Sequence, residues 1–312
     1  MKVLVTGGAG FIGSHVVEKL VKQGYQVRVL DDLSTGSLDN LSNVVGDIEF
    51  IKGDVRDYEA VSRAVEGVDL IVHEAAITSV VRSIEDPLTT SLVNVQGTLN
   101  LLWASVRNSI KRFVYASSSS IYGDTPALPK HEELTPNPLS PYAVSKLAGE
   151  EYCQVFHKVY GLSTVALRYF NVYGPRQHYG PYSGVVSIFI NRILNKQPPV
   201  IYGDGEQTRD FTFVEDVAEA TIKALETEGI DGEVFNVGCG SPISINQLAK
   251  TLMEVAGVSF EPIYTEPRKG DIRHSHADIK KAKELLKWRP STTLREGLAR
   301  TYIWFKESSS LT

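Results

Sequence analysis

The sequence predicts an α/β fold in which helices cover both faces of a parallel sheet. In the first half of the chain, apolar segments typical of strands alternate with segments of helical periodicity. The strand segments, for example Val3-Leu4-Val5, show no alternation of polar and apolar residues, which is typical of strands buried on both faces. The chain has 312 residues, of which 42% are hydrophobic and 22% charged, so it can enclose a sizeable core.

The elements of this first half follow one another in a regular order. We expect strands at Lys2–Thr6, Gln26–Leu30, Glu49–Lys52, Leu70–His73, Arg112–Ala116 and Thr164–Leu167. Helices are expected between them, at Phe11–Gln23, Asp57–Val65, Thr90–Ser109 and Pro141–Tyr160. Strands that alternate with helices in this way form parallel βαβ units.

The sequence changes character after Asn171, where Gly, Pro, Tyr and His become frequent. Helices are expected again at Val185–Asn195 and Glu215–Thr227. Strands are expected at Phe211–Val214, Val234–Val237 and Pro262–Tyr264. We therefore predict a doubly wound sheet domain and a smaller C-terminal α/β domain. The first comprises residues 1–174 and 211–240, and the second comprises residues 175–210 and 241–312.

Composition and charge argue against several classes of function. The net charge is −5 and no basic block is present, so no nucleic-acid partner is expected. Cys153 and Cys239 lack metal-ligand spacing and the 7 histidines do not gather, so neither a metal nor a disulfide framework is expected. The N-terminus lacks a signal pattern and no segment is long enough to span a bilayer. We therefore expect a cytoplasmic protein with no membrane partner.

A glycine-rich turn joins the first strand to the first helix. Gly7, Gly10 and Gly13 permit a tight turn, close approach of the backbone to a pyrophosphate, and close packing of helix on strand. The N–H groups at the start of the helix then face the phosphates. This context predicts a Rossmann-type dinucleotide site.

Acidic residues after the next two strands indicate which dinucleotide binds. Asp31 lies 18 residues after Gly13, where a carboxylate can accept hydrogen bonds from ribose hydroxyls and would repel a 2′-phosphate. NAD is therefore favoured over NADP. The alternative is that Asp31-Asp32 only opens a polar turn. Asp54 could meet the adenine edge or could be an ordinary turn aspartate.

A tyrosine and a lysine on one helix predict a redox site. Tyr142 and Lys146 are four residues apart and therefore share a helix face, where the ammonium should lower the pKa of the phenol. Tyr142 could then take a proton from a sugar hydroxyl. The serine run 117–120 follows a strand at the ligand-binding edge of the sheet. Read separately, these features would be a surface tyrosine, a solvated lysine and a polar loop.

These residues resemble the extended short-chain dehydrogenase/reductase family, in its nucleotide-sugar epimerase branch. The similar segments are Thr6-Gly7-Gly8-Ala9-Gly10-Phe11-Ile12-Gly13, Ala116-Ser117-Ser118-Ser119-Ser120-Ile121-Tyr122-Gly123, Pro141-Tyr142-Ala143-Val144-Ser145-Lys146, Arg168-Tyr169-Phe170-Asn171, Thr208-Arg209-Asp210-Phe211 and Arg268-Lys269-Gly270-Asp271. The resemblance implies that Ser118, Tyr142 and Lys146 are catalytic. It also implies NAD contacts from Gly7, Gly10, Phe11, Ile12, Gly13, Asp31, Asp32, Asp54, Val55, Ala75, Ala76, Thr78, Asn94, Tyr142, Lys146 and Tyr169. Thr78 stands where some members carry lysine.

The same resemblance implies how a nucleotide sugar binds. Asn171, Arg209 and Arg268 are expected on the diphosphate and Asp271 on the uridine ribose, which suits arginine forks and a carboxylate. Arg209 and Arg268 could instead make ordinary charged contacts on the surface. Ser275 corresponds to a position that borders the sugar pocket, where a small residue admits N-acetyl groups.

The resemblance implies a UDP-sugar 4-epimerase that inverts C4 through a transient 4-keto sugar with bound NAD. Family dehydratases carry an Asp-Glu pair where this chain has Ser119-Ser120, so dehydration is not expected. We expect turnover of UDP-GlcNAc and UDP-GalNAc as well as UDP-Glc and UDP-Gal. A decarboxylase, a reductase, a uronic-acid epimerase and a non-catalytic NAD-binding protein are the alternatives. A homodimer is expected through Trp103 and the helix Pro141–Tyr160, although that apolar face could belong to the core.

Overall fold

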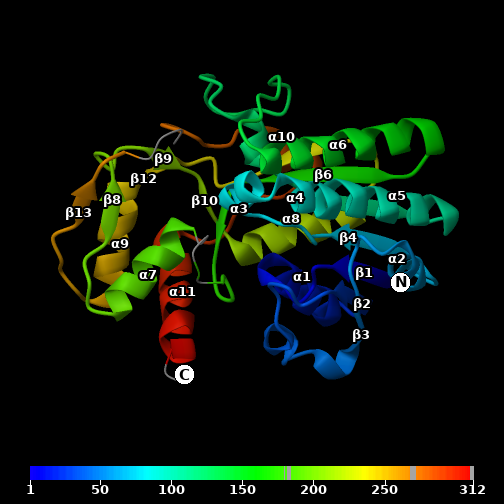
Figure 1. Ribbon diagram of the computed structural model, residues 1–312, viewed down its shortest axis with the longest axis horizontal. Helices are drawn as coiled ribbons and strands as arrows, with labels where there is room; N and C mark the ends of the chain where they lie inside the picture. The colour runs from blue at the N-terminus through cyan, green and yellow to red at the C-terminus, as the bar shows by residue number, and fades with distance from the viewer. Residues whose placement is uncertain (179, 181–183, 268–271, 310–312) are drawn as a thin grey trace.

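The computed structural model describes residues 1–178, 180, 184–267 and 272–309, and shows a larger part built on one sheet with a smaller part beside it (Figure 1). The sheet has seven strands in the order β3-β2-β1-β4-β5-β6-β11, each parallel to its neighbours. They are β1 (Lys2–Thr6), β2 (Gln26–Asp31), β3 (Ile48–Lys52), β4 (Leu70–His73), β5 (Arg112–Ser118), β6 (Thr164–Tyr169) and β11 (Val234–Val237). The predicted doubly wound parallel sheet is confirmed.

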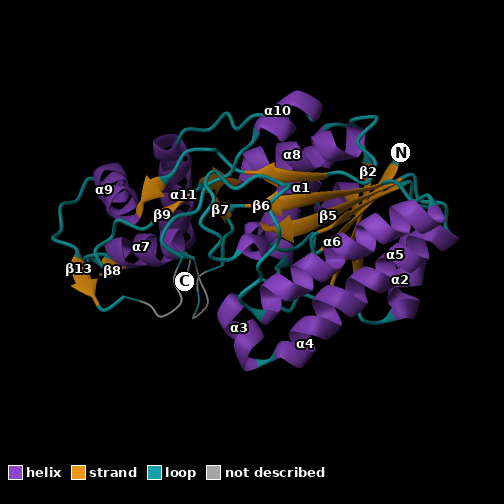
Figure 2. Ribbon diagram, turned by 90° about the horizontal axis from the view of Figure 1, so that it is seen from above, coloured by secondary structure: helices purple, strands orange, loops and turns teal. Residues whose placement is uncertain are grey.

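Helices cover both faces of this sheet, as Figure 2 shows. One face carries α1 (Phe11–Lys22) and α8 (Val214–Glu226), and the other carries α2 (Tyr58–Val65), α5 (Gly97–Arg107) and α6 (Pro141–Tyr160). Successive side chains of a strand point to opposite faces. Val3 and Val5 therefore pack in the core under α1 and α8, whereas Leu4 packs in the core under α2, α5 and α6.

The smaller part has its own core between helices. Phe189 of α7 (Val185–Leu194), Leu248 of α9 (Ile245–Ala256) and Leu298 of α11 (Leu294–Ser309) are buried there together. Three two-stranded sheets surround these helices. They pair β7 (Asn171–Tyr173) with β10 (Phe211–Phe213), β8 (Val200–Tyr202) with β13 (Ile263–Thr265), and β9 (Thr208–Arg209) with β12 (Ile243–Ser244).

The structure differs from the sequence prediction in two places that bear on the site. The segment expected as one helix at Thr90–Ser109 is divided into α4 (Pro87–Ser91), a π-helical turn (Leu92–Gln96) and α5, and α3 (Val80–Glu85) precedes it. The strand expected at Phe211–Val214 ends at Phe213 and pairs with β7 outside the large sheet. Strands of two or three residues have too few positions to display a period in sequence.

The remaining short helix is α10 (Lys280–Leu285), which packs against β11. Within the described ranges, no helix combines the length and apolarity that a membrane crossing requires. Cys153 and Cys239 are both free thiols.

His73 is an ionisable side chain buried at the end of β4. Its Nδ1 lies 2.7 Å from Thr6 Oγ1 and its Nε2 lies 2.9 Å from Thr98 Oγ1, so both ring nitrogens have hydroxyl partners. Burial, together with the ammonium of Lys146, lowers the pKa of His73 to about 3. The imidazole is therefore neutral in the folded protein at neutral pH.

We predict that protonation of His73 destabilises the fold in acid. The unfolded chain takes up this proton below pH about 6.5, whereas the folded protein takes it up only near pH 3. Stability is therefore fully present above the unfolded pKa and falls by about 1.4 kcal/mol per pH unit below it. Urea unfolding should show that His73→Gln flattens this slope by about one proton. An unchanged slope would contradict a buried neutral imidazole.

Candidate active site

The glycine turn leaves space where a cofactor phosphate can approach the backbone. Gly7 has φ +68°, and a Cβ at Gly13 would lie 2.2 Å from the Gly7 carbonyl oxygen. Helix α1 begins after Gly10 with no side-chain cap and no acidic residue in its first turn. Its first N–H groups and the positive end of its dipole are therefore available to an anion, so these residues fit a dinucleotide pyrophosphate.

Asp31 ends β2 beside this turn and is only 7% exposed. Its Oδ2 accepts a hydrogen bond from Ala9 N at 2.9 Å and its Oδ1 accepts one from Leu33 N at 2.8 Å. Burial raises the pKa of Asp31, and these backbone hydrogen bonds lower it. Each oxygen keeps a lone pair with which it can accept a ribose hydroxyl. Asp32 caps its own turn through Ser34 N at 2.9 Å.

Asp54 has a partner within its own turn. The guanidinium of Arg56 donates to its Oδ2 from Nε at 2.9 Å and from Nη2 at 2.5 Å. This guanidinium lowers the pKa of Asp54. Val55 is buried against α5, where a Cβ at Gly97 would lie 2.6 Å from Val55 Cγ2, so the turn packs closely on that helix. The turn-aspartate interpretation accounts for the contacts that Asp54 makes.

Asn94 connects the loop after β4 to the helix that carries Tyr142. It lies in the π-helical turn and is 1% exposed. Its Oδ1 accepts from Ile77 N at 2.8 Å, and its Nδ2 donates to Ile77 O at 2.9 Å and to Ser145 Oγ at 2.9 Å. Asn94 thereby fixes the segment that contains Ala75, Ala76 and Thr78, of which Thr78 is exposed.

The structure brings Tyr142 and Ser118 together at the carboxyl edge of the sheet. Ser118 ends β5, and its Oγ accepts a hydrogen bond from Ser120 N at 3.2 Å. Burial raises the pKa of Tyr142, the side-chain hydrogen bond with Ser118 lowers it, and the negative charge of Glu74 raises it. Tyr142 N donates to Ser83 Oγ at 3.0 Å, which ties α6 to α3.

The expected lowering of the pKa of Tyr142 by Lys146 is not found. The Lys146 ammonium donates to the carbonyl oxygen of Ala116 at 2.7 Å, so its charge is directed at β5 rather than at the phenol. Burial lowers the pKa of Lys146 to about 8, whereas Glu74 and Glu150 raise it. Ser118 is therefore the side chain that favours the phenolate of Tyr142.

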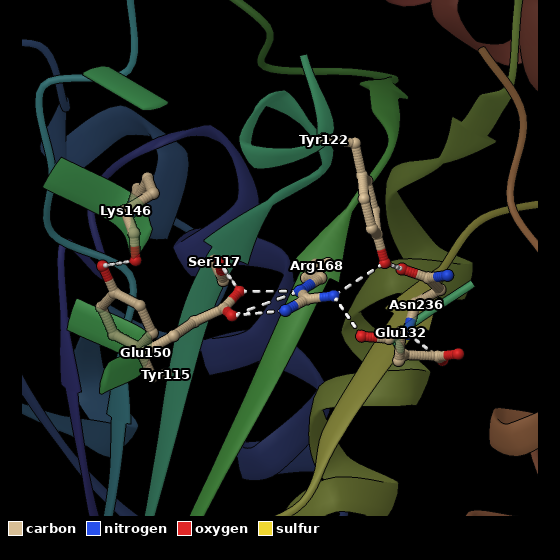
Figure 3. Close-up of polar contacts among 8 residues, drawn as sticks. All are labelled: Tyr115, Ser117, Tyr122, Glu132, Lys146, Glu150, Arg168 and Asn236. Carbon is tan, nitrogen blue, oxygen red and sulfur yellow. Dashed lines mark hydrogen bonds and ion pairs between the residues drawn. The ribbon is translucent and has the colours of Figure 1, made fainter. Parts of the chain in front are cut away.

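A buried polar network supports this edge of the sheet (Figure 3). Glu150 of α6 accepts from Arg168 Nη2 at 2.8 Å and from the hydroxyl of Ser117. Arg168 Nη1 donates to Tyr122 Oη at 2.9 Å and to Glu132 O at 3.1 Å, and Tyr122 Oη donates to Asn236 Oδ1 at 2.7 Å. The network thus joins β5, β6, α6 and β11 directly behind Ser118 and Lys146.

The sequence prediction missed Glu74, which directly follows β4. Its Oε1 accepts a hydrogen bond from Tyr169 Oη at 2.7 Å, and Tyr169 Oη also lies 2.7 Å from Thr221 Oγ1. Burial raises the pKa of Glu74 to about 7, and Tyr169 and Lys146 lower it. The signal in the sequence was a charged residue directly after a buried strand, at the edge of the sheet where Ser118 also ends its strand.

The residues expected on the nucleotide sugar lie where the two parts of the chain meet. Asn171 begins β7 and is opposite Phe211 of β10, two residues after Arg209. Ser275 N donates to Thr208 O at 3.2 Å, so Ser275 lies beside Arg209. Arg268 and Asp271 lie outside the described residues.

The segment that contains Ser275 also reaches the loop after Ser118. Lys130 N donates to His276 O at 2.9 Å, and Asp278 N donates to Lys130 O at 2.7 Å. Further along the smaller part, a cavity of about 570 Å³ is lined by residues that include Tyr202, Gln207, Pro267 and Ile272.

Comparisons with known proteins agree with this geometry. Residues 3–238 match the model of the NAD dependent epimerase/dehydratase family. The chain belongs to this family. It is 40% identical over 313 residues to a UDP-glucose 4-epimerase of Mycolicibacterium smegmatis, with 99% of this chain and 100% of the relative covered. The family is NAD-dependent, so the predicted cofactor is confirmed.

Two solved structures have the same fold over nearly the whole chain. The UDP-glucose 4-epimerase of Thermotoga maritima with UDP-glucose gives a TM-score of 0.94 at 42% identity, covering 99% of this chain and 100% of that one. The UDP-N-acetylglucosamine 4-epimerase of Methanobrevibacter ruminantium, in complex with UDP-N-acetylmuramic acid, gives 0.95 at 40% identity, covering 98% of each chain. These family members act on different sugars, so the family alone does not identify the sugar.

We predict that Gly13→Ala reduces the amount of bound NAD at least about tenfold, because the new Cβ would displace the Gly7 carbonyl and with it the phosphate-binding turn. Released nucleotide should be quantified by chromatography after denaturation. Gly46→Ala is the matched control, since no heavy atom lies within 4 Å of a Cβ there and its φ is not positive. Full NAD content in Gly13→Ala would show that the turn does not hold the pyrophosphate.

Proposed function

We propose that the protein is a UDP-sugar 4-epimerase that acts on UDP-GlcNAc and UDP-GalNAc as well as on UDP-Glc and UDP-Gal. The observation that carries the proposal is the hydrogen-bonded pair Tyr142 and Ser118, with Lys146 on the same helix face, at the sheet edge beside the glycine turn. Inversion at C4 needs one acid–base group and one hydride carrier, and this arrangement supplies the first and accommodates the second.

Tyr142 would exchange the proton of the sugar C4 hydroxyl. Ser118 would donate a hydrogen bond to the phenolic oxygen when Tyr142 is deprotonated. This hydrogen bond can shift to the reacting oxygen of the sugar as the proton moves. When bound, NAD supplies the acceptor and donor of hydride, so that C4 passes through a ketone. The Lys146 ammonium, on the same helix face as Tyr142, would hold the nicotinamide ribose.

Inversion also requires that either face of C4 can be turned towards the hydride carrier while the C4 oxygen stays within reach of Tyr142. Asn171, Arg209 and Arg268 would hold the diphosphate, because amide and guanidinium groups are suited to phosphate oxygens. A sugar that is held only through its diphosphate can turn in the pocket. The cavity of about 570 Å³ that Tyr202, Gln207 and Arg273 help to line is within the size range of small-molecule sites, which supports a nucleoside there.

The Ser118 turn itself favours epimerisation over dehydration. Ser119 and Ser120 lie in the 3-10 turn after Ser118, and neither can act as the acid or base that expels water from a sugar. Ser120 Oγ is buried and has no hydrogen-bond partner among the described residues. A substrate hydroxyl would satisfy it.

We also propose a homodimer through α5 and α6. Trp103, Val144, Val155, Val159 and Tyr160 are exposed apolar side chains of these two adjacent helices. The Trp103 and Tyr160 rings pack together at 5.9 Å, so the two helices present a continuous apolar surface. Contiguous exposed apolar surface of this kind is typical of a protein interface.

Incubation with UDP-GlcNAc without added cofactor tests the proposed activity. The anomeric proton signals of UDP-GalNAc should appear in NMR spectra while total nucleotide sugar stays constant. Tyr142→Phe should slow this conversion by on the order of 10³-fold, because the phenyl ring cannot exchange a proton. A lighter product formed from UDP-glucuronic acid would indicate decarboxylation instead, since UDP-GlcNAc has no carboxyl group to lose. No change with UDP-GlcNAc or with UDP-Glc would overturn the proposed activity.

Sugar selectivity is predicted to depend on the size of residue 275. Ser275→Tyr should abolish turnover of UDP-GlcNAc and preserve that of UDP-Glc, because the bulky ring would occupy the space of the N-acetyl group. Ser275→Ala is the control that keeps the position small and should keep both activities. Initial rates on both sugars provide the measurement. Equal loss on both sugars in Ser275→Tyr would refute the selectivity argument.

A further inference from the structure

Glu74 is an ionisable group at the site that the proposed proton exchange does not use. Its N donates to Thr6 O at 3.1 Å, and its carbonyl carbon lies 3.0 Å from the position that a Cβ on Gly7 would take. Glu74 therefore stands between the ends of β1 and β4. The chain adds β2 and β3 on one side of β1 and then returns to add β4 and β5 on its other side. The sheet therefore has its topological switch point between β1 and β4. Ligands bind at such a switch point, so the carboxyl group lies at the cofactor crevice.

The hydroxyl group of Tyr169 holds the carboxyl group in place. Thr221 of α8 lies 2.7 Å from Tyr169 Oη, which donates to Glu74 Oε1 at 2.7 Å. Tyr169 is 7% exposed and Thr221 is fully buried, whereas Glu74 is half-buried. A phenolic O–H directed at a carboxyl oxygen favours the ionised form.

The cationic neighbour of Glu74 is Lys146. Burial raises the pKa of Glu74 to about 7, with Tyr169 and Lys146 opposing the rise. Burial lowers the pKa of Lys146 to about 8, with Glu74 and Glu150 opposing the fall. Each charge therefore stabilises the other near neutral pH. A further positive charge beside the pair would favour the carboxylate more strongly.

We propose that the Glu74 carboxylate, oriented by Tyr169 at the crevice between β1 and β4, biases the bound nicotinamide towards its oxidised, positively charged form. The inference rests on the proposed placement of the nicotinamide ribose at Lys146. The oxidised ring carries a positive charge that the reduced ring lacks. A fixed carboxylate at this crevice therefore stabilises the oxidised cofactor selectively.

The bias has a use in an epimerase. A resting enzyme that holds the reduced cofactor cannot begin by oxidising C4, and it returns to activity only when a ketone is supplied. Coupling between sites is reciprocal, so a carboxylate that favours the cationic ring is itself kept ionised by that ring. The same charge then holds Lys146 protonated through the catalytic cycle.

Competition between the two cofactor forms tests the proposal without any sugar. Purified protein is equilibrated with equal concentrations of NAD⁺ and NADH, free nucleotide is removed, and bound nucleotide is released and quantified. In Glu74→Gln the bound ratio of NAD⁺ to NADH should fall about tenfold, which corresponds to about 1.4 kcal/mol. The amide keeps an oxygen that can accept from Tyr169, so the variant removes the charge and preserves the contact.

Thr221→Val is the matched control. It removes the hydroxyl beside Tyr169 with no change of charge and should leave the ratio as in the wild type. If Glu74→Gln does not yield folded protein, Glu74→Asp is the second variant. It shortens the side chain by one methylene and moves the carboxylate away from the crevice, so the bound ratio of NAD⁺ to NADH should fall by a smaller factor. A wild-type ratio in whichever Glu74 variant folds overturns the proposal. Loss of epimerisation in the wild type would instead refute the proposed activity, since the ratio needs no turnover.

Discussion

The buried ion pair between Glu150 and Arg168 is the interaction on which the catalytic edge of this protein depends. Both side chains are removed from water, which is costly unless every charged oxygen and nitrogen finds a partner. Here Ser117, Tyr122 and the carbonyl of Glu132 supply those partners (Figure 3). Removal of either charge would leave the other buried without compensation. The pair therefore fixes the relative positions of α6, β5 and β6.

This constraint reaches the reacting groups through simple helix geometry. Tyr142, Lys146 and Glu150 follow one another at intervals of four along α6, so they lie on one helix face. Gly149 lets that helix approach β5 closely, because a Cβ there would lie 2.2 Å from Tyr115 Oη. The same Glu150 binds the hydroxyl of Ser117, the neighbour of Ser118. One buried carboxylate thus sets the distance between the proposed base and its serine partner.

Sequence reasoning succeeded where a pattern is local and failed where contacts are made at a distance. Four elements have the predicted bounds: the strands Lys2–Thr6, Leu70–His73 and Val234–Val237 and the helix Pro141–Tyr160. Their signals, which are apolar runs and the Ser140 cap, consist of residues adjacent in the sequence. Strands such as β9 and β12 have two residues each and exist only because Arg209 meets Ile243 across the chain. The partners of Glu74 come from β6 and α6, and the pKa of Tyr142 depends on its burial. None of these could be deduced from spacing.

The charges around Tyr142 explain why its environment combines opposing effects. Burial excludes water from the reaction but raises the pKa of the phenol, and the carboxylate of Glu74 raises it further. An acid–base group with so high a pKa holds its proton and cannot begin the reaction. Ser118 offsets part of this effect, and a cationic nicotinamide beside Lys146 would offset more. The oxidised cofactor would then favour the phenolate form, which can accept the C4 hydroxyl proton, and after reduction the pKa of Tyr142 would rise again so that the phenol retains that proton. The order of proton and hydride exchange follows from that electrostatic coupling.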